Sequence, residues 1–278
     1  MSDIEISEGR ISEDGIASGA SAAARPSALA PTDLLRTAAD PALTEDIALG
    51  LLKRADLHSE ILEQLAKNAT ALKSRKVKIA LVSHPHTPRH VSVPLARQFY
   101  TFDLMKVALA PSVPADVKVA VDDVLISRLK TVTLGERLAL ARRASGRVAA
   151  ALLLDLENRD GKIVDKKASD TNRETRVMQT ALENPRLTEA LVINSVLCPV
   201  ANAALVHAVA QHGKWSRRRE IRAALLRTKH LSLARALEFS FEIPASLLQE
   251  VLASSRLPAQ TKEQLLRESE KRSASAPC

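Results

Sequence analysis

The sequence PALTE at residues 41–45 returns as PRLTE at residues 185–189, a shift of 144 positions. Around it, Asp40–His86 aligns with Asn184–His230 without a gap, and both apolar and basic positions coincide. Periodic apolar residues can match by chance, so the shared Pro-x-Leu-Thr-Glu and the basic matches are the stronger signal. Internal similarity over a unit of this size is typical of stacked structural repeats, because one unit cannot bury its apolar face alone.

Between its ends the chain has the periodicity of helices. Apolar residues recur at spacings of three and four, as at Val117, Val121, Val124 and Leu125, and no segment alternates as a strand would. Residues that favour helix N-caps precede these patterns, and glycine is rare. The N-cap candidates are Thr32, Thr44, Thr87, Ser145, Thr188 and Ser216. The pattern predicts an all-α protein with roughly fourteen helices of about 8–17 residues.

The composition narrows the class of protein further. Of the 278 residues 46% are hydrophobic, enough to bury a core, so wholesale disorder is excluded. No run of eighteen apolar residues occurs, so we expect no membrane-spanning helix. Cys198 and Cys278 are the two cysteines, which excludes a disulfide framework or a thiolate metal cluster and favours a reducing, cytoplasmic location.

The two ends and one internal stretch break the helical pattern. Residues 1–31 are rich in Ser, Ala and Gly and carry five acidic residues against two arginines, which predicts a disordered acidic arm. The net charge of +8 for the whole chain therefore becomes +11 for the remainder. The predicted order is the arm at 1–31, helical repeats at 32–156, a flexible charged insertion at 157–173, further repeats of the same solenoid at 174–270, and a frayed tail at 271–278.

Residues 76–95 (KVKIALVSHPHTPRHVSVPL) resemble the bacterial leucine-rich repeat variant, in which a helix ends at an Asn/His-Pro turn and Thr-Pro opens the next. A similar turn occurs in ENPRL at residues 183–187. Over about residues 32–270 the paired helices resemble HEAT-like α-solenoids. The resemblance implies a right-handed α-solenoid of short antiparallel helix pairs, but no particular function, because such folds serve unrelated tasks. The iron–sulfur cluster of one repeat-variant protein needs clustered cysteines, which this chain lacks, so we expect no cofactor.

Two segments concentrate the positive charge. Residues 71–90 hold five cations and no acid, and residues 212–227 hold six cations against Glu220. The candidate binding residues are Lys73, Arg75, Lys76 and Lys78 in the first segment and Lys214, Trp215, Arg217, Arg218, Arg219 and Arg222 in the second. Because the internal alignment matches the two segments, they would present two basic patches in related orientations. Three alternatives stay open: a solvated face with arginines paired to neighbouring carboxylates, an anionic ligand such as nucleic acid, or an acidic protein surface.

Aromatic side chains are scarce, with six in the chain. Trp215 lies inside the second basic segment, where it would either stack on a base between arginines or pack a helix start on the preceding repeat, at the position of Ala71. For the other aromatic clusters, at 99–102 and 239–241, the predicted role is core filling.

No sequence motif of a common enzyme class occurs. His86 and His90 have the i,i+4 spacing that can chelate zinc, but no cysteine or carboxylate is near them in sequence. His84 and His86 stand where the repeat needs turn residues, so turn and cap roles are predicted in place of a metal site. Asp122 and Asp123 are expected on the polar side of a helix, ionised and solvated.

The sequence therefore predicts a non-catalytic α-solenoid scaffold for protein–protein interaction, which binds its partner along a long concave surface. The alternative is a nucleic-acid-binding solenoid that uses the two basic segments, and a third is a DNA-base-modifying enzyme built in the groove. The enzyme would require a pocket that contains a buried carboxylate or histidine with a perturbed pKa. The expected partner is another protein or an acidic surface, no membrane is expected, and the sequence does not indicate an oligomeric state.

Overall fold

The computed structural model describes residues 30–154 and 168–275, and all regular structure in these ranges is helical. They contain sixteen α-helices and one short 3₁₀ helix, so the all-α prediction is confirmed for the described residues. The first helices are α1 (Pro31–Ala39), α2 (Glu45–Leu52), α3 (Ser59–Lys67), η1 (Ala71–Lys73), α4 (Arg75–Ser83), α5 (Arg89–Ala96), α6 (Thr101–Leu109), α7 (Ala115–Arg128), α8 (Leu134–Arg143) and α9 (Gly146–Leu154). The others are α10 (Ala168–Leu182), α11 (Glu189–Leu197), α12 (Ala203–Gln211), α13 (Arg219–Leu226), α14 (Leu233–Phe241), α15 (Ala245–Ala253) and α16 (Ala259–Ser275).

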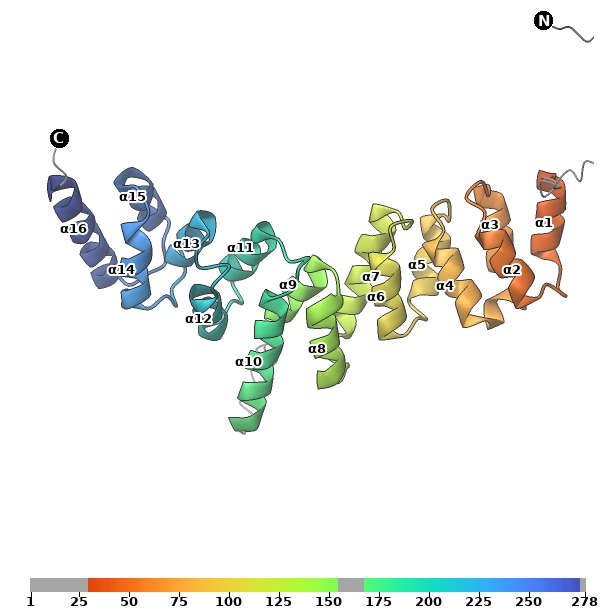
Figure 1. Cartoon of the computed structure of the whole chain (residues 1–278), viewed down its shortest axis with the longest axis horizontal. Helices are drawn as coiled ribbons and strands as arrows, with labels where there is room; N and C mark the ends of the chain where they lie inside the picture. Colours follow the sequence, from red (N-terminus) through yellow and green to blue (C-terminus); the bar gives the residue numbers. More distant parts are fainter. Residues whose placement is uncertain (1–29, 155–167, 276–278) are drawn as a thin grey trace, which may run out of the picture.

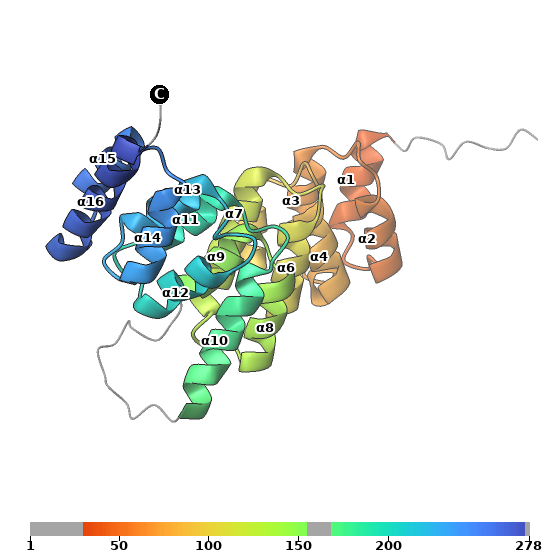
Figure 2. The same ribbon diagram turned by 60° about the vertical axis from the view of Figure 1, so that its left-hand side comes forward.

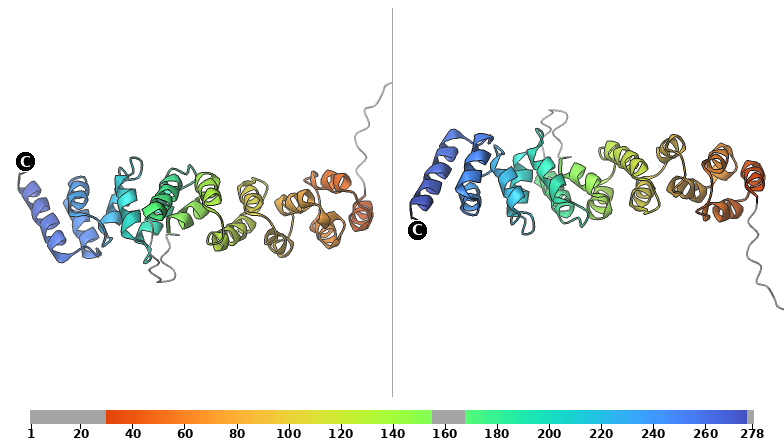
Figure 3. Two further views of the ribbon diagram at one scale, coloured as in Figure 1. Left: turned by 90° about the horizontal axis from the view of Figure 1, so that it is seen from below. Right: turned by 90° about the horizontal axis from the view of Figure 1, so that it is seen from above.

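The helices follow one another along the long axis of the molecule (Figure 1), and the views in Figure 2 and Figure 3 show the same order. Every extensive contact joins helices that are one or two places apart in the chain. Helices two places apart stack in rows: α2, α4 and α6 belong to one row, and α5, α7, α9, α11, α13 and α15 follow one another in the second. Such contacts are compatible with a helical-repeat stack, in which each unit buries its apolar face against its neighbours.

The 144-residue shift found in the sequence also relates the positions of the helices. Each of α2 to α7 begins 144 residues before its counterpart among α11 to α16, as Glu45 precedes Glu189 and Ala115 precedes Ala259. The packing corresponds as well, because α2 packs on α4 as α11 packs on α13, and α5 packs on α7 as α14 packs on α16. We call α1–α7 the first copy and α10–α16 the second copy, with α8 and α9 between them.

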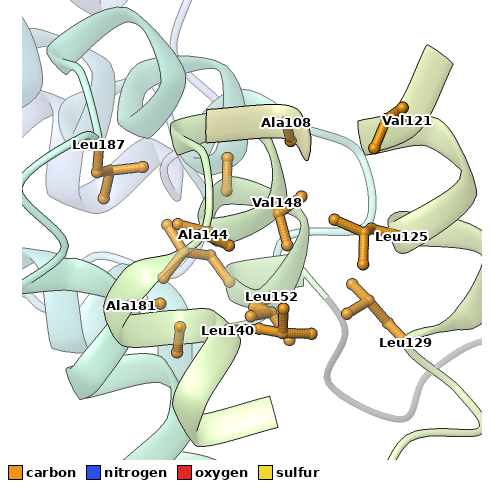
Figure 4. Packing of buried hydrophobic residues seen from close by; sticks show 14 of the residues in the cluster. Ala108, Val121, Leu125, Leu129, Leu140, Ala144, Val148, Leu152, Ala181 and Leu187 are labelled. Carbon is orange, nitrogen blue, oxygen red and sulfur yellow. The ribbon is translucent and has the colours of Figure 1, made fainter. Parts of the chain in front are cut away.

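Burial of side chains repeats with the same shift. Counterparts that are at most 1% exposed in both copies include Ala48 and Val192, Leu62 and Val206, Val77 and Ile221, Leu81 and Leu225, Leu104 and Leu248, and Val121 and Leu265. They belong to one hydrophobic cluster that also includes residues of α8 and α9. Figure 4 shows this junction, where Leu140 of α8 lies near Ala181 of α10, and Val148 of α9 lies on the side of Leu125 of α7. The core therefore continues from the first copy into the second.

Side chains of one repeat close the helix ends of the repeat before it. The last carbonyl groups of a helix have no partner within that helix. Asn68 donates from Nδ2 to the carbonyls of Ala38 and Asp40 at the end of α1, at 3.0 and 2.7 Å. Ser112 donates to the carbonyl of Ser83 at the end of α4, at 2.7 Å. Such bonds span 28 to 30 residues, close to the 30 residues that separate the starts of α2 and α4.

The structure moves three predicted boundaries. α1 begins at Pro31, α10 begins at Ala168, and α16 continues to Ser275. Residues 168–173 and 271–275 are therefore helical, which corrects the prediction of an insertion and a frayed tail over them. The rest of the predicted arm, insertion and tail, except for 30–31, lies at 1–29, 157–167 and 276–278, outside the described residues. In the two described ranges no helix has both the length and the apolar character needed to span a membrane.

Candidate binding surface

Arg75, at the start of α4, is fixed by a carboxylate of α6. Its Nε and Nη2 atoms donate to the two oxygens of Asp103, at 2.7 and 2.8 Å. The Asp103 side chain is only 2% exposed, whereas that of Arg75 is 60% exposed. The hydrogen bonds that Arg75 donates to Asp103 raise the pKa of Arg75 above its usual value. A bidentate pair of this kind holds the charged guanidinium in one orientation at the surface.

Tyr100 lies next to this ion pair. The Cζ atom of Arg75 lies over the Tyr100 ring, 5.0 Å from its centre, and Tyr100 is 70% exposed. Tyr100 is the last residue of the turn between α5 and α6, residues 97–100, which we call the α5–α6 turn. The turn therefore presents an exposed aromatic ring with a fixed cation against it.

Two further cations bind the α5–α6 turn. Lys78 of α4 donates from Nζ to Oε1 of Gln98 at 3.2 Å. Arg128 of α7 donates to the carbonyl of Phe99, at 2.6 Å, and to that of Arg97. These acceptors are neutral, so no carboxylate among the described residues pairs with Lys78 or Arg128.

A surface hollow of about 560 Å³ on α5 leads to the same turn. It is lined by Arg89, His90, Val93, Pro94 and Arg97. Arg97 belongs to both the hollow and the turn. Arg89 lies 3.9 Å from Asp116 and His90 lies 3.6 Å from Glu63, so carboxylates reach the far end of the hollow.

The remaining candidates of the first basic segment differ in their pairing. Lys76 lies 3.1 Å from Glu45, and hydrogen bonds from Lys76 and Ser74 lower the pKa of that carboxyl. Lys73 is exposed and has no ion pair within the described residues. Lys76 thus fits the alternative of a solvated, internally paired face.

Trp215 packs inside the molecule and does not reach the surface. The residue is 2% exposed, and its Nε1 donates to the carbonyl of Leu182 at the end of α10, at 2.8 Å. The Nζ atom of exposed Lys214 lies 4.1 Å from the ring centre. Because the ring is buried, it cannot stack on a nucleobase, so Trp215 is removed from the candidate binding residues and has the packing role instead.

The arginines of the second basic segment are partly used within the protein. Arg218 precedes α13 and lies 3.4 Å from Glu189. Arg222 is only 12% exposed, donates from Nε to the carbonyl of Ser216 and pairs with Glu242. Arg217 and Arg219 are exposed without an ion pair to a described residue. Two of these four candidates therefore remain as surface cations.

The structure does not bring the two basic segments together. α4 carries the first segment and stacks between α2 and α6, whereas α13 carries the second and stacks between α11 and α15, in the opposite row. The two helices also lie toward opposite ends of the molecule (Figure 1). The internal alignment matches their local packing, but they do not form one continuous patch.

The α5–α6 turn and its counterpart in the second copy have different surfaces. Residues 97–100 read Arg-Gln-Phe-Tyr, and residues 241–244 read Phe-Glu-Ile-Pro. Lys78 meets the neutral Gln98, whereas its counterpart Arg222 meets the acidic Glu242. The first turn is therefore cationic with an exposed Tyr100, and the second is neutralised.

Three of the six aromatic side chains are buried in the core, and three are exposed. Phe99 and Phe239 are buried, as is Trp215. Tyr100, Phe102 and Phe241 are 70, 41 and 57% exposed, which corrects the prediction for them. The internal alignment contained one indication of this difference. The counterparts of Phe99 and Tyr100 are Ile243 and Pro244, and only the position of Phe99 and Ile243 is buried in both copies.

His84 and His86 fix the turn after α4. Nδ1 of His84 accepts from the backbone N–H of His86, so the proton is on Nε2, which donates to the carbonyl of Arg54 at 2.8 Å. Nδ1 of His86 lies 3.0 Å from the carbonyl of Leu57. Both rings therefore bind the repeat before them. In residues 30–154 and 168–275, no three His, Cys, Asp or Glu residues are grouped so that they could hold a metal ion.

The prediction of two solvated carboxylates in α7 is wrong for Asp122. Asp122 is 4% exposed and its Oδ1 has no hydrogen-bond partner, whereas Asp123 is exposed and lies 2.9 Å from Arg147. Burial raises the pKa of Asp122, although a hydrogen bond from Ser145 and the charge of Arg147 oppose the shift. Asp122 is not among the residues that line the hollow on α5, so this carboxyl does not meet the requirement for an enzyme pocket there.

No protein-family model, curated protein or solved structure matches this chain. The interpretation of the surface therefore rests on its own geometry.

Proposed function

We propose that the protein is a non-catalytic scaffold, a HEAT-like α-solenoid of antiparallel helix pairs, that binds another protein along its surface. The extensive contacts join helices one or two places apart, so the stack grows in length and offers many side chains on one extended surface. A partner of comparable length can then contact several repeats at once.

The observation that carries this proposal is an apolar stripe on α14. Leu233, Leu237 and Phe241 are spaced four residues apart and share one face of the helix. Leu233 is 40% and Phe241 57% exposed, while Leu237 packs partly on the core. Grouped apolar side chains at a surface, with an aromatic residue among them, are typical of protein contact sites.

Affinity purification of the cross-linked full chain tests this proposal. We expect a protein that co-purifies with the wild type to be lost from the double variant Leu233→Ser, Phe241→Ser, because the variant removes the apolar contact area. Ile47→Ser is the matched control, since Ile47 is 50% exposed on α2 in the first copy. Equal recovery from the double variant, with an unchanged circular dichroism spectrum, would contradict the proposal.

A second candidate function is nucleic-acid binding, and a specific observation favours it. Tyr100 is an exposed aromatic ring against Arg75, and cations without carboxylate partners surround its turn. This form of the proposal uses the first basic segment only, because the second holds a buried Trp215 and an Arg222 paired with Glu242.

A further inference from the structure

We infer that the α5–α6 turn of the first copy is a binding site for single-stranded nucleic acid, centred on Tyr100, an inference that rests on the second proposed function. The site consists of the Tyr100 ring, the cations Lys78, Arg97 and Arg128 around it, and the hollow on α5 that ends at Arg97.

Tyr100 is held in position as a stacking platform. Its neighbour Arg75 cannot swing away freely, because both oxygens of the buried Asp103 accept from the Nε and Nη2 atoms of the guanidinium. The ring remains 70% exposed, so a base can reach it. Base-on-aromatic stacking needs no particular sequence, since every base has a flat face, and a neighbouring arginine strengthens it.

The charges around Tyr100 suit a phosphate backbone. Lys78 and Arg128 contact only neutral acceptors, and Arg97 is exposed without an ion pair to a described residue. Each acid named near the site has a partner within the protein. Asp103 binds Arg75, Asp116 lies near Arg89, Glu63 lies near His90, and Glu136 accepts from the backbone and side chain of Thr133. The positive charge next to the ring is therefore available to an external anion.

The second copy shows that the scaffold does not require these residues. At the counterpart turn, Phe241 replaces Arg97, Glu242 replaces Gln98 and Pro244 replaces Tyr100. The core residues beneath are conserved in kind, as Phe99 and Ile243 are each 4% exposed. The fold of the repeat therefore does not require the cations and the tyrosine that the first copy carries at its surface.

The exposed ring distinguishes a single strand from the other polyanions. In a duplex the bases are already stacked on one another, and an acidic polypeptide has no base to place on the ring. The expected ligand is therefore a single strand whose bases are free to stack, of DNA or RNA, with affinity that falls as salt rises.

Fluorescence anisotropy with the full chain and labelled twenty-nucleotide oligothymidine and oligouridine tests the site. We expect Tyr100→Ala to weaken binding about 5- to 100-fold, and Tyr100→Phe to keep wild-type affinity, because stacking needs only the ring. Lys78→Gln and Arg97→Gln should each reduce the slope of log affinity against log salt by about one. Arg75 is left intact, because its removal would strand the buried Asp103 carboxylate and destabilise the fold.

The second copy provides matched controls. Phe241→Ala removes an exposed aromatic ring and Arg219→Ala removes the counterpart of Arg75, and both variants should bind as the wild type does. Thermal melting monitored by circular dichroism should be the same for all variants, since each altered side chain is at the surface.

Four results would overturn the inference. If the wild type binds the oligonucleotides but Tyr100→Ala binds them equally well, this site is wrong while nucleic-acid binding stands. If the dissociation constant of the wild type for the oligonucleotides exceeds about 10 µM at low salt, the second proposed function is wrong as well. Duplex DNA binding as tightly as the single strand would exclude the stacking platform. Competition by polyglutamate at equal charge concentration would assign the patch to an acidic protein.

Discussion

Asp122 and Leu266 occupy the same position in α7 and α16, and their difference can be tested directly. Asp122 is buried with an unpaired Oδ1, while Leu266 packs against the core. An unsatisfied buried polar atom typically costs about 1–3 kcal/mol. We therefore expect Asp122→Leu to stabilise the protein by about 1–2 kcal/mol at pH 7, as measured by urea denaturation.

The gain in folding stability from Asp122→Leu should decrease as the pH is lowered. Burial raises the pKa of Asp122 in the folded state above its ordinary value of 3.8. The folded state therefore holds the proton more tightly, and the penalty for the buried charge disappears as the pH falls from the folded pKa towards 3.8. The gain should be largest at pH 7 and shrink as pH 4 is approached. Asp123→Leu, at an exposed site, should change the stability by less than about 1 kcal/mol at either pH.

Gly146, the first residue of α9, is required by close packing of α9 against the second copy. A Cβ atom there would lie 2.3 Å from the carbonyl oxygen of Arg186 and 2.9 Å from Cδ1 of Leu191. We expect Gly146→Ala to lower the free energy of unfolding by about 1–3 kcal/mol, despite the higher helix propensity of alanine. Gly135→Ala in α8 is the control, because nothing lies within 4 Å of its added methyl group. A loss of stability in the Gly135 variant of the same size would argue against a steric cause.

At the scale of the helices, the sequence predicted the elements better than their first residues. Thr44, Ser145 and Thr188 accept from the backbone N–H three residues on, as predicted for N-caps. Thr32 lies inside α1, and Ser216 lies ahead of the N-cap Arg218. The hydroxyl of Thr87 instead donates to the carbonyl of Leu81, which closes the preceding helix. A hydroxyl in a short turn can serve either helix, and the sequence alone does not indicate which.

The candidate site was harder to predict than the helices, because the sequence does not indicate which aromatic ring is buried and which is exposed. Trp215 follows a lysine and precedes three arginines, yet its ring is buried and bonds to the end of α10. Tyr100 stands beside the buried Phe99 and has no adjacent basic residue. Two of the three cations around it, Lys78 and Arg128, come from α4 and α7 and are 22 and 28 residues away in sequence. Such a cluster requires the packing of α4 and α7 against the α5–α6 turn, which local sequence does not contain.

The hydrogen bond of Trp215 joins two elements of the second copy. Its Nε1 donates to the carbonyl of Leu182, at the position where Asn68 bonds to Ala38 in the first copy. Trp215→Phe keeps most of the ring but leaves that carbonyl unpaired, so we expect a loss of about 1–2 kcal/mol in urea denaturation followed by circular dichroism. Lys214→Ala, which removes the cation above the ring, should cost no more than about 1 kcal/mol. A larger loss for Lys214→Ala than for Trp215→Phe would show that this hydrogen bond is not what holds α10 to the turn between α12 and α13.

At the scale of the whole molecule, the number of places between counterpart helices decides in which row each of them lies. Counterparts stand nine places apart in the order of the described helices, as α4 and α13 do. Successive helices alternate between the two rows, so an odd offset such as nine places puts counterpart helices in opposite rows. The internal alignment therefore transfers core positions correctly but not the direction that a surface residue faces.

A stack held together by neighbour contacts should transmit a local defect only a short distance. Leu62 and its counterpart Val206 are both at most 1% exposed, and Trp215, the single tryptophan, reports on the second copy by fluorescence. Leu62→Ala should cost about 2–5 kcal/mol. We expect it to lower the urea midpoint seen by circular dichroism while the fluorescence midpoint moves far less, because α3 lies nine places before α12. Val206→Ala should lower the fluorescence midpoint directly. Equal shifts of both midpoints in Leu62→Ala would mean that the continuous core, and not the neighbour contacts, sets the cooperative unit.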